Sequence, residues 1–353
     1  MLRALKLTTL RMAQGLGLNS LLLQTRWRRR RLLILCYHGV SLEDEHEWGP
    51  ALYLPPALFR ERMEALRRMD CAVLPFGDAL SRLYAGSLPA RAVALTFDDG
   101  GYDFYRVAYP ILREYDYPVT LYLTTYYAQY NRPVFDVMLP YLLWKGRSKI
   151  LVWPELLRDP VRLQETGRVE VARRLKEHVR NAAHSAGDKD RLLASLAGKL
   201  GIDYERLCAK RVLQLMTLEE ARDLAARGLS IQLHTHRHRL SRQRELFARE
   251  IEDNRRSIAQ VAAAPAVHFC YPGGFHLPES VGFLEELGVQ SAVTCEPGLA
   301  GDSTNRYLLP RFLDSTNVTP VEFAAWVSGF ATFLSRRSQP VNPDPLSDGA
   351  ASG

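Results

Sequence analysis

Two groups of residues in this sequence could bind a metal ion. Asp98 and Asp99 are adjacent and follow an apolar run, and His234 and His238 are four residues apart after another apolar run. Adjacent carboxylates repel each other unless a cation lies near one of them or the two have different roles. Neutral imidazoles together with a carboxylate are good ligands for zinc or another divalent transition metal. The pattern predicts a metal bound by three protein ligands, with a fourth position open for water.

Each group by itself has a simpler explanation. An Asp-Asp-Gly sequence at the end of a strand is typical of a turn or a helix cap. The histidine run, which includes a third histidine at position 236, could be a solvated basic loop. Both groups end apolar runs of the same alternating pattern, so a shared site is favoured over two unrelated loops.

The elements that must position these residues alternate between strands and helices. Repeated βα units predict a parallel sheet, either a barrel or a doubly wound sheet, and the carboxyl ends of parallel strands meet on one face. The expected buried strands are 32–37, 92–97, 119–123, 230–233, 268–271 and 291–294. The expected helices are 56–69, 105–115, 218–227, 246–264, 277–287 and 320–334. The strand ends with chemically useful residues are His38, Asp98 to Gly101, His234 to His238 and Tyr271 to Gly274.

The chain divides into three expected parts. Residues 1–31 form a basic arm, and residues 32–335 form the catalytic domain, interrupted at about 127–216 by a helical insert without strand-like runs. Residues 336–353 form a tail that is rich in proline and too poor in apolar residues to fold.

The composition is that of an ordinary globular protein, with 47% hydrophobic and 24% charged residues. The formal net charge is +7, but the arm carries eight basic residues and no acid, which leaves −1 for the rest of the chain. A nucleic-acid partner is therefore not expected, because it would need a basic groove in the folded body. The five cysteines are scattered without a CxxC spacing, which argues against a disulfide framework and indicates a reducing compartment.

The arm is too polar to span a membrane. Its longest uncharged run, Met12 to Thr25, has 14 residues and includes several polar side chains. The arginine cluster follows the apolar part, unlike a secretory signal, so we expect the arm to stay attached. It could lie on an anionic membrane or pack on the domain as a helix with a solvated arginine run. We expect a cytoplasmic protein, peripheral to the inner membrane face.

Three motifs in order resemble those of a known family. They are Thr96-Phe97-Asp98-Asp99-Gly100, His234-Thr235-x-x-His238 and Phe269-x-Tyr271-Pro272-x-Gly274. Together they resemble the polysaccharide deacetylases, the NodB-homology enzymes of carbohydrate esterase family 4. The segments around Tyr37-His38 and Pro310-Arg311 also resemble accessory patterns of this family, and the resemblance covers roughly residues 32 to 335.

The resemblance implies an α/β fold, a distorted (β/α)7 barrel, and removal of acetyl groups from sugars with one divalent metal, for which zinc is the first choice. By position, Asp99, His234 and His238 would be the metal ligands and Asp98 the base that activates water. The backbone N–H of Gly273 would donate to the oxyanion.

The sequence departs from the family at the third motif, where Cys270 replaces an arginine that orients the catalytic Asp98. Arg311 could supply the guanidinium from another direction, or it could pair on the rim, since arginine suits carboxylate contact in either setting. Thr235 is expected to brace its loop, and His236 is expected to be solvated.

The family's late motif with the general acid is also missing, because no histidine follows Arg311. His38 and His276 are candidate substitutes. The alternative for His38 is that it supports the metal loop without taking part in proton transfer.

We therefore expect a metal-dependent hydrolase of non-peptide carbon–nitrogen bonds that removes acetyl groups, N-acetyl before O-acetyl, in cell-surface polysaccharide metabolism. The substrate would be an acetylated glycan or a lipid-linked saccharide. The alternatives are a non-catalytic glycan-binding protein on the same fold, a non-sugar amidase and a glycoside hydrolase. The last needs carboxyl groups about 5 Å or more apart across a sugar, which the adjacent Asp98 and Asp99 fit less well.

Overall fold

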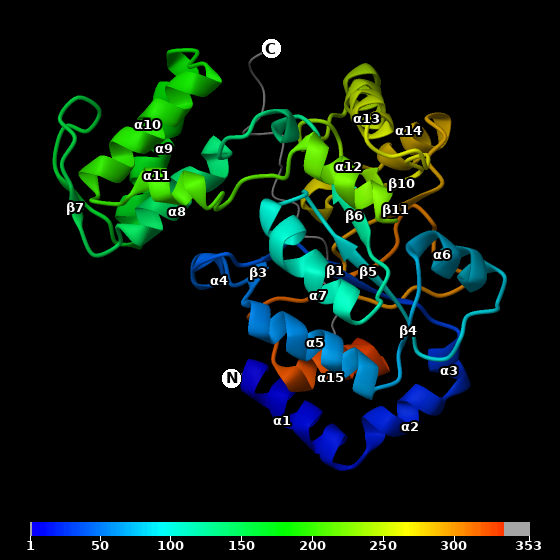
Figure 1. Cartoon of the computed structure of the whole chain (residues 1–353). Helices are drawn as coiled ribbons and strands as arrows, with labels where there is room; N and C mark the ends of the chain where they lie inside the picture. The colour runs from blue at the N-terminus through cyan, green and yellow to red at the C-terminus, as the bar shows by residue number, and fades with distance from the viewer. Residues whose placement is uncertain (1, 335–353) are drawn as a thin grey trace.

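The computed structural model describes residues 2–334. A parallel sheet lies at the centre, with helices packed around it (Figure 1). Seven strands follow one another in the order β11-β10-β9-β6-β5-β1-β12, and β4 pairs with the beginning of β5. The strands are β1 (Leu33–Tyr37), β4 (Ala72–Val73), β5 (Ala92–Phe97), β6 (Thr120–Leu123), β9 (Ser230–Leu233), β10 (His268–Cys270), β11 (Ser291–Val293) and β12 (Phe312–Leu313).

The sheet curls until its two edges approach each other. Val293 of β11 forms a parallel bridge with Leu309, which lies just before β12. The Leu309 N–H donates to the Ala292 carbonyl at 3.0 Å, and the Thr294 N–H donates to the Leu309 carbonyl at 2.9 Å. The expectation of a distorted (β/α)7 barrel is confirmed, and the doubly wound alternative is excluded.

The central strands are the apolar runs seen in the sequence. Every residue of β1 and β5 is buried, and the two strands pair in register from Leu33 opposite Val93 to Tyr37 opposite Phe97. Because both faces of these strands are covered, their residues are nearly all apolar instead of alternating. The exception is Thr96, whose hydroxyl donates to the Leu35 carbonyl. Each of the six expected strands is present and at most one residue shorter than predicted.

The barrel helices agree with the expected helices except at some ends. The stretch 105–115 begins with a π-helical turn at Phe104–Ala108 before α7 (Tyr109–Glu114). The stretch 320–334 is divided because Gly329, with φ of 87°, ends the first helix and a 3-10 turn follows. The other helices that cover the barrel are α5 (Pro56–Arg68), α6 (Phe76–Tyr84), α12 (Leu218–Ala226), α13 (Arg244–Ala259), α14 (Ser280–Glu286) and α15 (Pro320–Ser328).

Residues 127–216 form a helical body to one side of the barrel (Figure 1). Their buried apolar side chains form a core cluster of their own. The expectation of no strand here is wrong, because β7 (Ile150–Leu151) and β8 (Val161–Arg162) pair antiparallel. The helices of this body are α8 (Phe135–Lys145), α9 (Glu165–Asn181), α10 (Ala186–Lys199) and α11 (Tyr204–Ala209).

The end of this helical body is tied to the loop that follows β5. The Met216 N–H donates to the Gly100 carbonyl at 2.9 Å, and the Tyr102 N–H donates to the Gln214 carbonyl at 2.8 Å. A short segment of the insert therefore holds the loop that carries Asp98 and Asp99.

The arm consists of α1 (Leu2–Gly15), α2 (Leu18–Gln24) and α3 (Arg26–Arg29). The first two pack against α15, and α3 packs against α2 (Figure 1). Leu10 is fully buried in the main core. Arg28 is also fully buried, and its Nε donates to the Val327 carbonyl at 3.0 Å. The packed-helix alternative is thus confirmed, but the expectation of an entirely solvated arginine run is wrong. None of the helices within 2–334 is long and apolar enough to cross a membrane.

Candidate active site

The polar strand ends gather on the carboxyl face of the barrel. Asp98 and Asp99 follow β5, His234 follows β9, and His38 follows β1. Arg311 reaches this place from the segment directly before β12. Neighbouring strands bring together residues that lie more than 200 positions apart in the sequence, as parallel α/β barrels do at this face.

Asp99, His234 and His238 can hold one metal ion. The Asp99 Oδ1 lies 3.2 Å from His234 Nε2 and 3.3 Å from His238 Nε2. Zinc bonds of about 2.0 to 2.1 Å in a tetrahedron place ligand atoms roughly 3.3 Å apart. Both distances therefore match ligands of one small cation, and all three ligand atoms lie within 4.8 Å of one another. Their donor set of two imidazoles and one carboxylate suits a divalent transition metal.

The hydrogen bonds of His234 favour this use of its ring. Its Nδ1 lies 2.8 Å from the carbonyl oxygen of Cys270, so Nδ1 carries the proton and donates. The Nε2 lone pair is then free to bind a metal, in the arrangement by which carbonyl groups orient ligating histidines. His234 is buried, whereas the side chain of His238 is 42% exposed. The open side of the cluster is therefore at His238.

The backbone around these ligands adopts left-handed conformations. Asp99 has φ of 69°, Thr235 has φ of 59° and His238 has φ of 56°. Such angles are uncommon for residues other than glycine and are concentrated at functional sites. Thr235 Oγ1 accepts a hydrogen bond from the Arg239 N–H at 3.1 Å, which agrees with the expectation that Thr235 braces the loop.

Asp98 is held by Arg311 and not by a residue of the third motif. Arg311 Nη1 donates to Asp98 Oδ1 and Nη2 donates to Oδ2, both at 2.7 Å, and both residues are buried. Burial by itself would raise the pKa of Asp98, but the charge and hydrogen bonds of Arg311 outweigh it and keep the pKa well below its usual range. The rim alternative for Arg311 is excluded.

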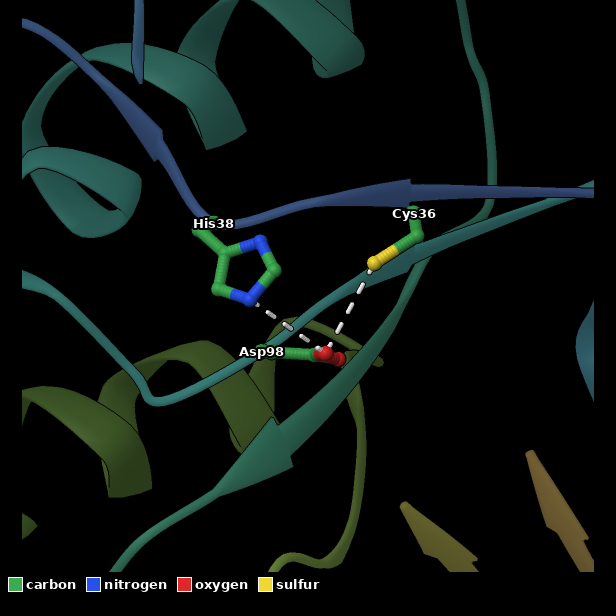
Figure 2. Close-up of side chains that lie close together, drawn as sticks. All are labelled: Cys36, His38 and Asp98. Atoms are coloured by element: carbon green, nitrogen blue, oxygen red, sulfur yellow. Dashed lines mark hydrogen bonds and ion pairs between the residues drawn. The ribbon is translucent and has the colours of Figure 1, made fainter. Parts of the chain in front are cut away.

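Cys270, which stands where the family has its arginine, contributes a thiol beside the same carboxylate. The Cys270 Sγ lies 3.4 Å from Asp98 Oδ2. Cys36 approaches the same oxygen from β1 at 3.6 Å, as Figure 2 shows. Arg311 Nη2 also donates to Cys270 Sγ, at 3.1 Å. The short thiol leaves the space in which the guanidinium of Arg311 lies.

Two further groups of side chains have metal-ligand spacing, and both contain Asp98. One consists of Asp98, Cys36 and His38, and the other of Asp98, His234 and Cys270. Both oxygens of Asp98 are already engaged by Arg311, and a cation there would lie against the buried guanidinium. The group of Asp99 is therefore the better metal site.

His38 lies beside Asp98 (Figure 2). Its Nε2 is 3.9 Å from Asp98 Oδ2, and its side chain is 18% exposed. Its Nδ1 is buried and has no hydrogen-bond partner among residues 2–334. The other candidate acid, His276, packs beside Tyr271, with the two ring centres 5.9 Å apart. Of the two histidines, His38 is the one that approaches Asp98.

Gly273 lies in a 3-10 turn (Pro272–Gly274) directly after β10, and it is exposed with φ of 65°. Within the described part of the chain, its N–H has no hydrogen-bond acceptor. This N–H is therefore available to a ligand at the carboxyl face.

His236 is not solvated, so that expectation is wrong. It is 7% exposed, and its Nδ1 lies 2.8 Å from the Oγ1 of Thr125 at the end of β6. Burial lowers its pKa. The imidazole of His236 therefore ties the histidine loop to the end of β6, where its hydrogen-bond partner Thr125 lies.

Two buried residues near the site had no recognisable signal in the sequence. Asn254 of α13 accepts from the His234 N–H at 2.9 Å and donates to the Leu123 carbonyl at 2.9 Å, so it joins the ends of β9 and β6. Asp103 accepts from the Val40 N–H at 2.7 Å, and burial raises the pKa of its carboxyl to about 7. Both look like ordinary polar residues of helical stretches when only their neighbours in sequence are considered.

The chain has relatives with the same motifs and fold. Residues 85–292 match the family model described as polysaccharide deacetylase. A putative polysaccharide deacetylase of Bacillus subtilis, YxkH, is 22% identical over 302 residues, which cover 84% of this chain and 76% of the relative.

Solved structures of deacetylases share the fold. The Streptococcus pyogenes deacetylase PplD, in complex with acetate, has a TM-score of 0.55 and 20% identity, with 84% of this chain and 98% of the other covered. IcaB from Ammonifex degensii has a TM-score of 0.53 and 18% identity, with 84% and 97% covered. The protein belongs to the polysaccharide deacetylase family and is a deacetylase of the hydrolase class.

Proposed function

We propose that the protein removes acetyl groups, N-acetyl before O-acetyl, from a cell-surface carbohydrate, using one divalent metal, zinc by first choice, held by Asp99, His234 and His238. One observation carries this proposal. An oxygen of Asp99 lies 3.2 and 3.3 Å from two imidazole nitrogens, directly beside a carboxylate that is fixed by a buried arginine.

A divalent cation bound there would polarise the acetyl carbonyl and lower the pKa of a water molecule toward neutrality. The residues of the chain supply the rest. Asp98 accepts the proton of the attacking water, while Arg311 keeps its carboxylate ionised and oriented. The free N–H of Gly273 donates to the oxygen on which negative charge develops.

An amide substrate needs a proton on the leaving nitrogen, which an ester needs less. His38 is the residue that we assign to this step, because its ring lies beside Asp98 and is partly exposed. Imidazole is the side chain best suited to deliver a proton near neutral pH. The presence of this ring is the support for N-acetyl over O-acetyl groups.

The substrate that we propose is an acetylated glycan or a lipid-linked saccharide, with acetate as the product. The structure of PplD contains acetate, which is consistent with that product. A glycoside hydrolase is less well supported, because one carboxylate is paired with Arg311 and the other lies between two histidines. A non-catalytic binder is less well supported because Arg311 occupies the role of the family's missing arginine.

We further propose that the arm contacts anionic membranes, at the cytoplasmic face. Met12, Leu16 and Leu21 are 64 to 76% exposed, although they are apolar. The five cysteines are free, as expected in a reducing compartment. An amphipathic basic surface binds such membranes through apolar burial and attraction to anionic lipids.

The direct test is acetate release from a panel of acetylated glycans and lipid-linked saccharides. We expect release from at least one N-acetylated member, loss of release with a chelator, and recovery on adding a divalent metal. Release that survives complete metal removal would contradict the metal-dependent function. Cleavage of glycosidic bonds without acetate release would support the glycoside hydrolase.

A further inference from the structure

Three of the five cysteines surround the ion pair of Arg311 and Asp98. Arg311 Nη2 lies 3.1 Å from Cys270 Sγ and 3.4 Å from Cys295 Sγ. Cys36 Sγ lies 3.6 Å from Asp98 Oδ2. The base and the residue that orients it are therefore in direct contact with thiols, which are the most easily oxidised groups of the site.

Cys36 and Cys295 lie against the same ion pair. Cys36 Sγ is 3.6 Å from Asp98 Oδ2, and Cys295 Sγ is 3.4 Å from the Arg311 Nη2 that holds this oxygen. They come from different strands: Cys36 is in β1, and Cys295 follows β11 across the junction where the barrel closes. Cys36 is fully buried, whereas Cys295 is partly exposed. A reagent from solvent would thus meet Cys295 before Cys36.

The surroundings of Cys295 also favour its thiolate. The hydrogen bond from Cys36 and the charge of Arg311 lower its pKa to about 6, against the effect of burial. Burial raises the pKa of Cys71 to about 11 and that of Cys208 above its ordinary value. The thiolate is the nucleophile in thiol oxidation, so Cys295 is the reactive cysteine of these three.

The turn after β10 packs tightly on Cys295. Gly274 has φ of 74°, and a Cβ atom there would lie 2.4 Å from the Cβ of Cys295. This turn also presents the N–H of Gly273 to the site. Cys295 therefore contacts both the turn that carries Gly273 and the guanidinium of Arg311. Oxidation of its sulfur would displace both of these neighbours.

We propose that Cys295 is an oxidation site for hydrogen peroxide and that it forms a disulfide with Cys36 which inactivates the deacetylase. The Cys295 thiolate attacks the outer peroxide oxygen, so that an S–O bond forms, the O–O bond breaks and hydroxide leaves as water after taking a proton. The Cys36 thiol then attacks the sulfenic sulfur. An S–S bond forms, the S–O bond breaks, and the departing hydroxide takes the Cys36 proton as a second water.

The disulfide inactivates the site through geometry. An S–S bond of about 2.05 Å requires both sulfurs to leave their places beside Asp98 and Arg311 and draws β1 and the loop after β11 toward each other. Asp98 contacts Cys36, and Arg311 contacts Cys295. A displacement of about 1 Å at catalytic groups costs on the order of a hundredfold in rate. This consequence rests on the proposed roles of Asp98 and Arg311, whereas formation of the disulfide does not.

The first experiment treats the metal-loaded full chain with hydrogen peroxide and maps its disulfides by mass spectrometry. We expect a Cys36–Cys295 cross-linked peptide, a loss of acetate release of at least tenfold that follows the cross-link in time, and recovery of both with dithiothreitol. Mapping is repeated on metal-free protein, so that the result does not depend on turnover. A protein that cross-links Cys270 with Cys295, or that shows no cross-link, overturns the assignment.

The second experiment compares Cys295→Ser with two matched controls, Cys71→Ser and Cys208→Ser. Each variant is measured relative to its own untreated activity, and melting curves verify that it is folded. Peroxide should inactivate both controls like the wild type and should leave Cys295→Ser largely unaffected. Equal sensitivity of Cys295→Ser, or a cross-linked wild type that keeps its activity, contradicts the inactivation. If the untreated enzyme releases no acetate, the proposed function is contradicted. The disulfide map still shows in that case whether Cys36 and Cys295 become cross-linked.

Discussion

Arg311 holds both carboxylate oxygens of Asp98 at 2.7 Å, although the two residues lie 213 positions apart in the sequence. The guanidinium is further fixed by the Thr294 carbonyl, to which its Nε donates at 2.9 Å. Asp98 is thereby held in one orientation beside Asp99. Arg311 reaches Asp98 from the segment directly before β12, and the thiol of Cys270 lies beside its guanidinium.

We expect Arg311→Lys to lower kcat at least tenfold while leaving metal binding intact. A lysine keeps the charge, but a single ammonium cannot reproduce the two parallel hydrogen bonds. Arg62→Lys is the matched control, because Arg62 forms another buried pair with Asp314 at 3.0 Å. Both variants should lose stability, and only Arg311→Lys should lose turnover beyond what its folded fraction explains. Similar kcat values for Arg311→Lys and Arg62→Lys would show that Arg311 does not orient Asp98 for catalysis.

Asp98→Asn should abolish turnover and keep the metal bound. The amide has the same shape, but it cannot accept the proton of water. The change also leaves the buried Arg311 without its counter-charge, which costs about 3 to 5 kcal/mol of stability, so melting must be measured alongside activity. Elemental analysis gives the metal content. Loss of the metal together with activity would mean that Asp98 shares the ligand role with Asp99.

The combined variant His234→Ala with His238→Ala should lose its stoichiometric metal. Two of the three proposed ligands are removed, and one carboxylate alone does not retain a transition metal in competition with a chelator. His178→Ala, in the helical body, is the control and should retain the metal. A full equivalent of metal in the double variant would place the site elsewhere, with the two groups that contain Asp98 as the next candidates.

The sequence predicted the strand ends of this site well, because each strand is a continuous apolar run and polar residues begin where it ends. The partners of those residues were harder to predict. His236 is buried only because Thr125 from another strand bonds its ring, and Asn254 reaches the site from the buried side of α13. Such contacts depend on how elements pack and leave no local pattern. The tail expected at 336–353 lies outside the described residues.

Stability should fall as the pH rises from about 4 to 7 because of Asp103. Burial raises the pKa of its carboxyl to about 7 in the folded protein, whereas an unfolded aspartate titrates near 3.9. The folded state therefore binds more protons in this window, and ionisation destabilises it by a few kcal/mol above about pH 7. Asp103→Asn should be more stable than the wild type at pH 8 and show little gain at pH 4.

This comparison uses denaturant unfolding of metal-free protein, because a cation at Asp99 would favour the ionised form of Asp103. The exposed Asp159 provides the control, since Asp159→Asn should give the same free energy of unfolding as the wild type at both pH values. A stabilisation by Asp103→Asn that is independent of pH would show that the carboxyl does not titrate in this range.

The membrane contact of the arm is best tested with point substitutions. Removing residues 1–31 would also remove Leu10 and Arg28 from the core. A truncated chain could then lose vesicle binding because it is misfolded and not because it lacks the basic surface. Among the arm's cations, Lys6 pairs with Glu322 and Arg30 with Asp302. Arg3 donates to the Asn317 carbonyl. The exposed arginines whose side chains have no hydrogen-bond or ion-pair partner within 2–334 are Arg11, Arg26 and Arg29.

Reversing these three charges to glutamate should weaken binding to anionic vesicles by on the order of a hundredfold or more, since each basic residue near such a surface contributes about 1 kcal/mol. The control reverses three exposed arginines of the helical body, Arg158, Arg162 and Arg180, which gives the same net charge. Vesicle sedimentation at low and high salt measures the effect. Binding that both triple variants lose equally would reflect net charge alone, and binding that the arm variant retains would leave the arm as a packed structural layer of the barrel.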